Sequence, residues 1–297
     1  MGINSNQLKT FLTPYKIYPK FQIKTLPEIY RYAKFGMIGS IMGRLPELLT
    51  PIFVKTYVDL FSLGILQRAQ GINNIFNQFF STAINAVASP TYSKMKTQKE
   101  SLVKYFSFII GLNSRLNYLA FTGLFLLADQ FIYLVYTEKW MPAVPYIKLL
   151  IVYSVCHQFM GIFRTFLFSI GDTKIVAYTN ILISSIFFLL LIPLFKFKGI
   201  IGICLAISAS ALLGFLYIIY IVKRTNKINI FYAFITPYFP TLFSSLVYLS
   251  ASNHIQFSNL WFEFILHVII LLSLFGIFTY FFDLKFYKNL FLNSKLF

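Results

Sequence analysis

The sequence predicts an all-α polytopic membrane protein with about eight transmembrane helices. The composition is 58% hydrophobic and 20% aromatic with only 12% charged residues, which is typical of a chain whose solvent is lipid. Each of eight apolar stretches holds at least 21 residues, and about 20 suffice to cross the hydrocarbon core as a helix. The predicted spans are Phe35–Val58, Ile65–Ala88, Phe106–Ala128, Val144–Phe168, Ile175–Phe195, Gly199–Val222, Ile230–Ala251 and Leu260–Phe282.

The distribution of Lys and Arg predicts that both termini are cytoplasmic. Short cytoplasmic loops carry the excess of positive charge in membrane proteins. Of the 26 Lys and Arg residues, 17 fall in the tails and alternate loops, three fall in the opposite loops, and six lie within spans. The net charge of +17 is therefore a topology signal that also favours anionic lipid headgroups, and we expect no nucleic-acid partner. The first 34 residues lack the apolar run of a signal peptide.

The first span carries a stripe of charged side chains on one helical face. The stripe consists of Arg44, Glu47, Pro51, Lys55 and Asp59, and two prolines, Pro46 and Pro51, lie in its middle. Ionisable groups inside a membrane usually face a cavity and handle a ligand, and prolines bend or break a helix. One alternative is a self-neutralising network that pairs Arg44 with Glu47 and Lys55 with Asp59. We favour a wet face.

The second span presents a broad face of amides. Its polar residues are Gln70, Asn73, Asn74, Asn77, Gln78, Ser81 and Asn85. Amides often join membrane helices to one another, and that is one interpretation. Seven polar groups exceed what one helix contact needs, so we expect this face to form a cavity wall.

The third and fourth spans add further intramembrane charge. Arg115 shares a face with Tyr118 in the third span, and Tyr153, His157 and Arg164 align in the fourth. His157 is either a hydrogen-bonded core residue or a proton-sensitive group, since histidine titrates near neutrality. Both alternatives stay open at this point.

The last four spans are predicted to be scaffold. The fifth, sixth and seventh contain no charge, and the eighth contains only Glu263, which lies four residues before His267. We expect this i,i+4 pair to be an interfacial ion pair.

Motifs for catalysis are not found in the sequence. It has no GxxxxGK[ST] loop for ATP, its three histidines are scattered, and its aspartates are isolated. Both cysteines, Cys156 and Cys204, fall inside spans and are interpreted as buried apolar residues. We therefore expect no enzymatic activity, no cofactor and no metal.

Several motifs carry a family resemblance. They are Phe61 to Gly64 before the amide-rich helix, ASPTYS (88–93) before a basic loop, YTEKWMPAVP (136–145), GDTK (171–174) and GIIG (199–202). In order and spacing, the region from Tyr18 to Thr225 resembles the C-terminal half of Wzx-like oligosaccharide and polysaccharide flippases. These proteins belong to the multidrug/oligosaccharidyl-lipid/polysaccharide exporter superfamily.

The resemblance implies two six-helix lobes that face each other across a central cavity. It implies the flipping of undecaprenyl-diphosphate-linked oligosaccharide across the bacterial plasma (inner) membrane during surface polysaccharide biosynthesis, such as that of lipopolysaccharide O-antigen. By this analogy Arg44, Arg115 and Arg164 are candidates for the diphosphate, and Asn74, Asn77 and Gln78 for sugar hydroxyls. Glu47, Lys55 and His157 complete the set of expected cavity residues.

One departure from the family pattern concerns length. Residues 1–34 resemble the cytoplasmic segment that links the lobes, residues 35–225 one six-helix C-lobe, and residues 226–297 two extra helices with a short tail. A split or truncated flippase that needs an N-terminal lobe on another chain is therefore expected. The alternatives are a cation-coupled drug or metabolite antiporter of the same superfamily and a non-transporting remnant or assembly subunit.

Overall fold

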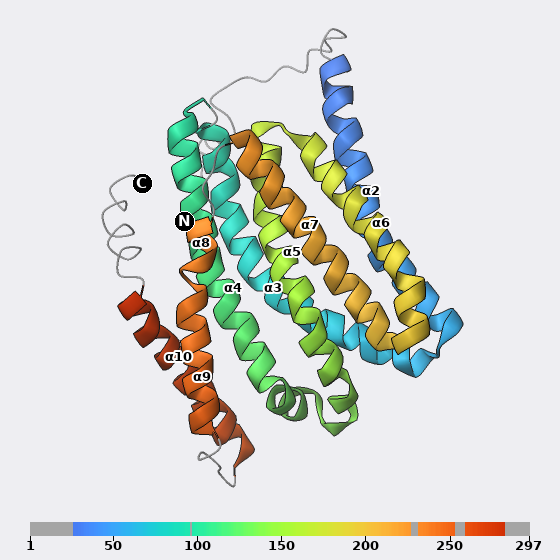
Figure 1. The fold of residues 1–297 in the computed structure, drawn as a ribbon, viewed down its shortest axis with the longest axis vertical. Coiled ribbons are helices and arrows are strands. Elements are labelled where there is room, and N and C mark those ends of the chain that lie inside the picture. The colour runs from blue at the N-terminus through green and yellow to red at the C-terminus, as the bar shows by residue number, and fades with distance from the viewer. Residues whose placement is uncertain (1–25, 96, 227–230, 253–258, 283–297) are drawn as a thin grey trace, which may run out of the picture. The chain divides into compact units, whose positions relative to one another are not determined.

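The computed structural model describes residues 26–95, 97–226, 231–252 and 259–282 of the chain. Its contacts divide the chain into two units, Met1–Lys34 and Phe35–Phe297, and the arrangements described below lie within the second. Figure 1 shows the helices in chain order. They are α2 (Leu26–Tyr57), α3 (Leu60–Lys94), α4 (Lys99–Tyr136), the 3-10 helix η2 (Glu138–Ala143), α5 (Val144–Ile170), α6 (Thr173–Lys198), α7 (Ile200–Asn226), α8 (Phe231–Ile235), α9 (Tyr238–Ser252) and α10 (Leu260–Phe282).

The predicted all-α membrane fold is confirmed. All regular secondary structure in the described ranges is helical, and six of these helices are long and apolar enough to cross a membrane. Two of the eight predicted spans do not meet this criterion of length and hydropathy. The amide-rich α3 is a continuous 35-residue helix but is not among the six. The predicted span Ile230–Ala251 is divided into α8 and α9 by a turn that includes Pro237, because proline lacks the donor that a continuous helix needs.

Local sequence signals set the helix ends. Asp59 caps α3, since its carboxylate accepts hydrogen bonds from the Ser62 backbone N–H (2.7 Å) and hydroxyl (2.7 Å). These bonds lower the pKa of Asp59 below its ordinary value of 3.8. At the GDTK motif, α5 ends on Gly171 with φ of 92°, a left-handed conformation that glycine adopts without steric cost.

Helices α6 and α7 form the tightest helix pair because α7 carries small residues at the contact. A Cβ atom at Gly202 would lie 2.0 Å from the Leu194 carbonyl oxygen, and one at Gly214 would lie 2.2 Å from Ile183 Cγ1. Both distances are far below van der Waals contact. At Gly202 the obstacle is backbone, so glycine is required there, whereas a side chain at position 214 would have to displace the Ile183 side chain. Small residues that let backbones approach are the usual glue between membrane helices.

Helix α2 lies against α6 through a similar close contact. A Cβ atom at Gly39 would lie 3.0 Å from Ala177 Cα, and the Asn180 amide donates to the Gly39 carbonyl at 2.8 Å. Pro46 has no N–H to donate to the Met42 carbonyl one turn earlier. The Ser184 hydroxyl of α6 donates to that carbonyl instead. The proline in α2 thus creates the acceptor that fastens α2 to α6.

The YTEKWMPAVP motif forms the turn from α4 through η2 into α5. It places two rings around a cation of α3, because the Arg68 guanidinium lies 4.8 Å from the Tyr136 ring centroid and 4.5 Å from that of Trp140. Cation–π stacking of this kind stabilises a partly desolvated guanidinium. The motif therefore fixes the end of α4 against α3.

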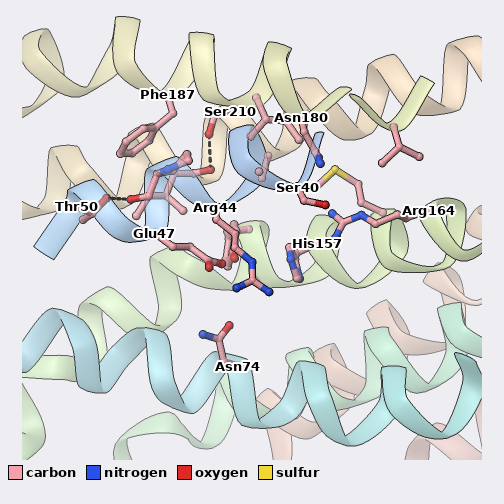
Figure 2. Close-up of a pocket in the computed structure, with 18 of the residues that line it drawn as sticks. Ser40, Arg44, Glu47, Thr50, Asn74, His157, Arg164, Asn180, Phe187 and Ser210 are labelled. Atoms are coloured by element: carbon pink, nitrogen blue, oxygen red, sulfur yellow. Dashed lines mark hydrogen bonds between the residues drawn. The ribbon is translucent and has the colours of Figure 1, made fainter. Parts of the chain in front are cut away.

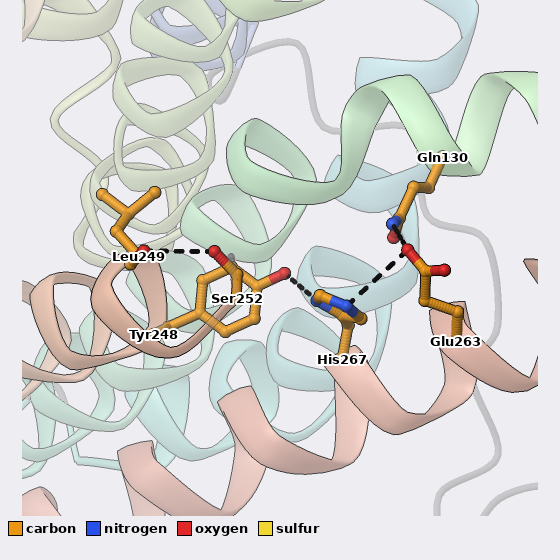
Figure 3. Close-up of polar contacts among 6 residues, drawn as sticks. All are labelled: Gln130, Tyr248, Leu249, Ser252, Glu263 and His267. Atoms are coloured by element: carbon orange, nitrogen blue, oxygen red, sulfur yellow. Dashed lines mark hydrogen bonds and ion pairs between the residues drawn. The ribbon is translucent and has the colours of Figure 1, made fainter. Parts of the chain in front are cut away.

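A buried polar network holds α10 against α9 and α4 (Figure 3). The Tyr248 hydroxyl bonds His267 Nδ1, His267 Nε2 lies 3.9 Å from a carboxylate oxygen of Glu263, and the Gln130 amide donates to the same oxygen at 2.9 Å. The predicted pairing of Glu263 with His267 is therefore present, and it lies in a mostly buried setting, with His267 only 3% exposed.

Candidate functional site

A polar cavity of about 660 Å³ lies between α2, α3, α5, α6 and α7 (Figure 2). Its polar and charged lining comes from Ser40, Arg44, Glu47, Thr50, Gln70, Asn74, Tyr153, His157, Arg164, Asn180 and Ser210. Apolar side chains such as Phe187 and Ile207 complete the wall. A site of this size accommodates a ligand of many atoms.

The helices bring together five of the nine site residues predicted from the sequence. Arg44 and Glu47 come from α2, Asn74 from α3, and His157 and Arg164 from α5. In Figure 2 the Arg44 side chain extends from α2 toward Asn74, and His157 lies between Arg44 and Arg164. The spacings in the sequence explain these positions, because residues three, four or seven apart share a helical face.

The charges in the cavity are not locked into close ion pairs. Among the described residues, no ion pair within 4.0 Å joins Arg44 to Glu47 or Lys55 to Asp59. Asp59 bonds Ser62 instead. Nor does any ion pair within 4.0 Å join Glu47 to Arg164 in the described ranges. The self-neutralising network on α2 is therefore not what the structure shows.

The polar face of α3 divides into two parts. Asn74 and Gln70 line the cavity, whereas Asn73 is buried, accepts from the Ser154 hydroxyl at 2.8 Å and donates to the Ala69 carbonyl at 3.0 Å. The amide face consequently serves both of the purposes that the sequence suggested. It joins α3 to α5 and it contributes to the cavity wall.

Four predicted site residues lie outside the cavity lining. Lys55 and Gln78 are exposed, and Asn77 and Arg115 are buried. The Arg115 guanidinium donates to the Gly111 carbonyl at 2.5 Å. Tyr118, on the same face of α4, lies with its ring 6.1 Å from that of Tyr238 in α9. That face of α4 is therefore directed toward the C-terminal helices, and a binding role for these four residues stays a prediction.

Several lining residues were not among the predicted site residues. Tyr153 packs against His157 with ring centroids 5.3 Å apart, and its alignment with His157 was visible in the sequence. Ser40 lies one helical turn before Arg44. Asn180 was visible as a lone amide in an apolar span, and it lines the cavity from α6.

The arrangement suits an anion that also carries hydroxyl groups. Two guanidinium groups offer planar donors for phosphate or carboxylate oxygens, and amides and hydroxyls beside them can bind sugar hydroxyls. Among the described residues no cluster of three or more metal-ligating side chains was found.

Comparison with known families identifies similar proteins. A family model described as "Polysaccharide biosynthesis protein" matches residues 5–145. The chain is 26% identical over 254 residues to an uncharacterized membrane protein in the cps region of Klebsiella pneumoniae, which covers 83% of this chain and 49% of that protein. It is 22% identical over 158 residues to the teichuronic acid biosynthesis protein TuaB of Bacillus subtilis strain 168, covering 53% of this chain and 33% of TuaB. The chain thus spans about half the length of the first relative and a third of the second.

Solved structures share the fold. The lipid II flippase MurJ in an inward closed conformation superposes with a TM-score of 0.66 at 20% identity, covering 96% of this chain and 59% of MurJ. A MOP superfamily transporter from Pyrococcus furiosus superposes with a TM-score of 0.55 at 17% identity, covering 85% of this chain and 64% of the transporter. Together the comparisons confirm the resemblance to Wzx-like membrane proteins of polysaccharide biosynthesis.

Proposed function

We propose that the chain is one lobe of a flippase that moves lipid-linked oligosaccharide across the bacterial plasma membrane for surface polysaccharide biosynthesis. It acts as a transporter and not as an enzyme. The observation that carries this proposal is the cavity in which Arg44 and Arg164 lie beside amides and hydroxyls. The similarity to polysaccharide biosynthesis proteins supports it.

The chemistry of the cavity favours a lipid-linked diphosphate of the undecaprenyl type. Guanidinium groups bind the oxygens of phosphate in a bidentate manner. We propose that Asn74 and Gln70, which line the same cavity, bind sugar hydroxyls. The lipid tail remains in the bilayer, so only the headgroup enters the polar cavity.

The exposure of α2 supports a second lobe that covers this side of the cavity. Arg44 and Glu47 are exposed, and they lie in a helix that is long and apolar enough to cross a membrane. Contact with hydrocarbon would cost roughly 2.5 to 3.5 kcal/mol for a central charge on insertion scales. We therefore propose that an N-terminal lobe covers the open side of the cavity and keeps it aqueous. Both described ends of this lobe are proposed to face the cytoplasm, because of the distribution of Lys and Arg.

Complementation of a flippase-null strain tests this function. The chain is expressed alone and together with the open reading frame that lies upstream, and surface polysaccharide is measured. We expect restoration only with both, and loss of restoration in Arg44→Gln and Arg164→Gln with normal membrane levels. Unchanged restoration by both arginine variants would contradict the proposal, and full restoration by the chain alone would contradict the need for a second lobe.

A cation-coupled antiporter is the second candidate, favoured by the acidic Glu47 in the cavity. Its signature would be drug resistance or ion-driven drug uptake that depends on Glu47 and is insensitive to glycan synthesis. Expression of the chain with its upstream partner in a drug-sensitive strain distinguishes the two functions.

A further inference from the structure

We propose that Arg68 and its two aromatic neighbours form a binding site for the phosphate group of a membrane lipid, separate from the polar cavity. Arg68 lies on α3, and the two rings belong to Tyr136 at the end of α4 and to Trp140 in η2. These residues lie outside the cavity lining. The inference goes beyond the proposed function and does not rest on it.

The Arg68 guanidinium has two ring neighbours but no oxygen partner. Its Cζ atom lies 4.8 Å from the Tyr136 ring centroid and 4.5 Å from that of Trp140. An aromatic ring offers no oxygen acceptor for the five N–H donors of a guanidinium. Within the ranges that the structure describes, no ion pair engages Arg68, and its Nε atom is buried without a hydrogen-bond partner. The side chain as a whole is half-buried, so a ligand from outside can reach it.

The carboxylates at the same end of the bundle do not supply the missing acceptor. Asp59 caps α3 with both of its carboxylate oxygens, and Asp129 pairs with Lys148 at 2.6 Å. Glu138 is exposed, and no ion pair within 4.0 Å joins it to Arg68 in the described part of the chain. A buried donor without an acceptor is costly, and an acceptor from outside the described chain removes that cost.

The surroundings of Arg68 favour a lipid phosphate as this acceptor. Tyr and Trp side chains gather at the headgroup level of a membrane, and Arg68 lies only about 12 Å along α3 from its first residue, Leu60. The exposed Lys139 adds a second cation, because its Nζ atom lies 5.9 Å from the Trp140 ring centroid. Guanidinium groups bind phosphate oxygens in a bidentate manner.

Two lipids present this chemistry at the membrane surface. One is an anionic phospholipid of the bilayer, and the other is a lipid-linked diphosphate. In the orientation proposed from the distribution of Lys and Arg, the first turns of α3 face the outer leaflet. A phosphate held there belongs either to a phospholipid that anchors this end of the bundle or to a lipid-linked diphosphate in that leaflet.

Lipid titrations followed by native mass spectrometry test the site on the purified full chain. Every protein in the series, the reference included, carries Arg44→Gln and Arg164→Gln, which remove the cations of the cavity. The lipids are phosphatidylglycerol, undecaprenyl diphosphate and a diacylglycerol with the same acyl chains but no phosphate. Arg68→Met keeps a long side chain and removes the charge. We expect it to weaken binding of a phosphate lipid about tenfold, the effect of one charge-assisted contact, and to leave diacylglycerol binding unchanged.

Two further variants separate this site from a general effect of charge. Lys198→Met is the matched control, since Lys198 is an exposed cation in the last turn of α6, and we expect it to change binding by less than about twofold. Arg68→Lys keeps a cation beside the two rings but lacks the planar fork of donors, so it should weaken binding about threefold. It also provides the test if Arg68→Met does not fold.

The pattern of losses identifies the source of the phosphate. A loss confined to phosphatidylglycerol supports the site with a bilayer phospholipid as its ligand, and a loss confined to undecaprenyl diphosphate supports it with the lipid-linked diphosphate. A loss for both supports a general site for lipid phosphate. Unchanged binding of both phosphate lipids in the Arg68 variants would overturn the inference. An equal loss in Lys198→Met, or an equal loss of diacylglycerol, would overturn it as well.

Discussion

The hydrogen bond from Ser184 to the Met42 carbonyl should matter only because Pro46 leaves that carbonyl without a helical donor. Ser184→Ala removes the substitute donor at the contact between α2 and α6. Interhelical hydrogen bonds in membranes contribute about 0.6 kcal/mol on average and up to about 1.7 kcal/mol. A carbonyl left unpartnered favours the upper part of this range, so we expect unfolding free energy to fall by about 1 kcal/mol.

The second perturbation is Pro46→Ala, which restores an N–H that can bond the Met42 carbonyl within α2. In this background Ser184→Ala should cost close to nothing. Unfolding free energies measured by steric trapping in bicelles give the coupling between the two positions. Ser208→Ala serves as the matched control, because Ser208 donates to the Leu149 carbonyl at 2.9 Å and no proline is involved. Equal costs of Ser184→Ala with and without Pro46 would refute the reasoning.

Three further outcomes are expected. Gly214→Ala should destabilise the chain by about 1 to 3 kcal/mol in the same unfolding assay, because its methyl group would overlap a neighbouring isoleucine, whereas Gly161→Ala, with open space around it, should not. Tyr248→Phe should speed amide exchange in α10 more than in α6, since it deletes the buried bond to His267; equal exchange in both helices would count against the network. The first turn of α3 should lose amide-exchange protection as the pH falls below 3.8, because the pKa of the capping Asp59 is lowered in the folded chain and its contribution disappears on protonation. Asp59→Ala should lack that pH dependence.

The sequence predicted the helices better than it predicted the cavity. Length and hydropathy located the spans, and the glycine in the GDTK motif marked the end of α5. The helical period also placed Arg44 and Glu47 on one face. Periodicity does not tell which neighbouring helix covers a given face. We expected Arg115 to line the cavity, but it is buried outside the cavity lining.

Contacts between helices account for the remaining differences between the predicted and the observed arrangement. The face of α4 that holds Tyr118 lies against Tyr238 of α9, and a single sequence contains no sign of that pairing. The link from Ser184 to α2 likewise depends on two segments far apart in the chain. Pro237 lies in the turn that interrupts the seventh predicted span, but Pro46 and Pro193 lie inside continuous helices, so a proline by itself does not predict an interruption.

Photo-crosslinking from the cavity to its ligand tests the central claim most directly. A benzophenone amino acid replaces Asn74, which lines the cavity, or Leu189, which is 75% exposed on α6, in cells that also express the upstream partner. We predict a glycan-containing adduct from position 74 that disappears when the first sugar-phosphate transfer to the lipid carrier is blocked. No adduct at position 74, or an equal glycan adduct at position 189, would contradict the assignment of this cavity to a lipid-linked oligosaccharide.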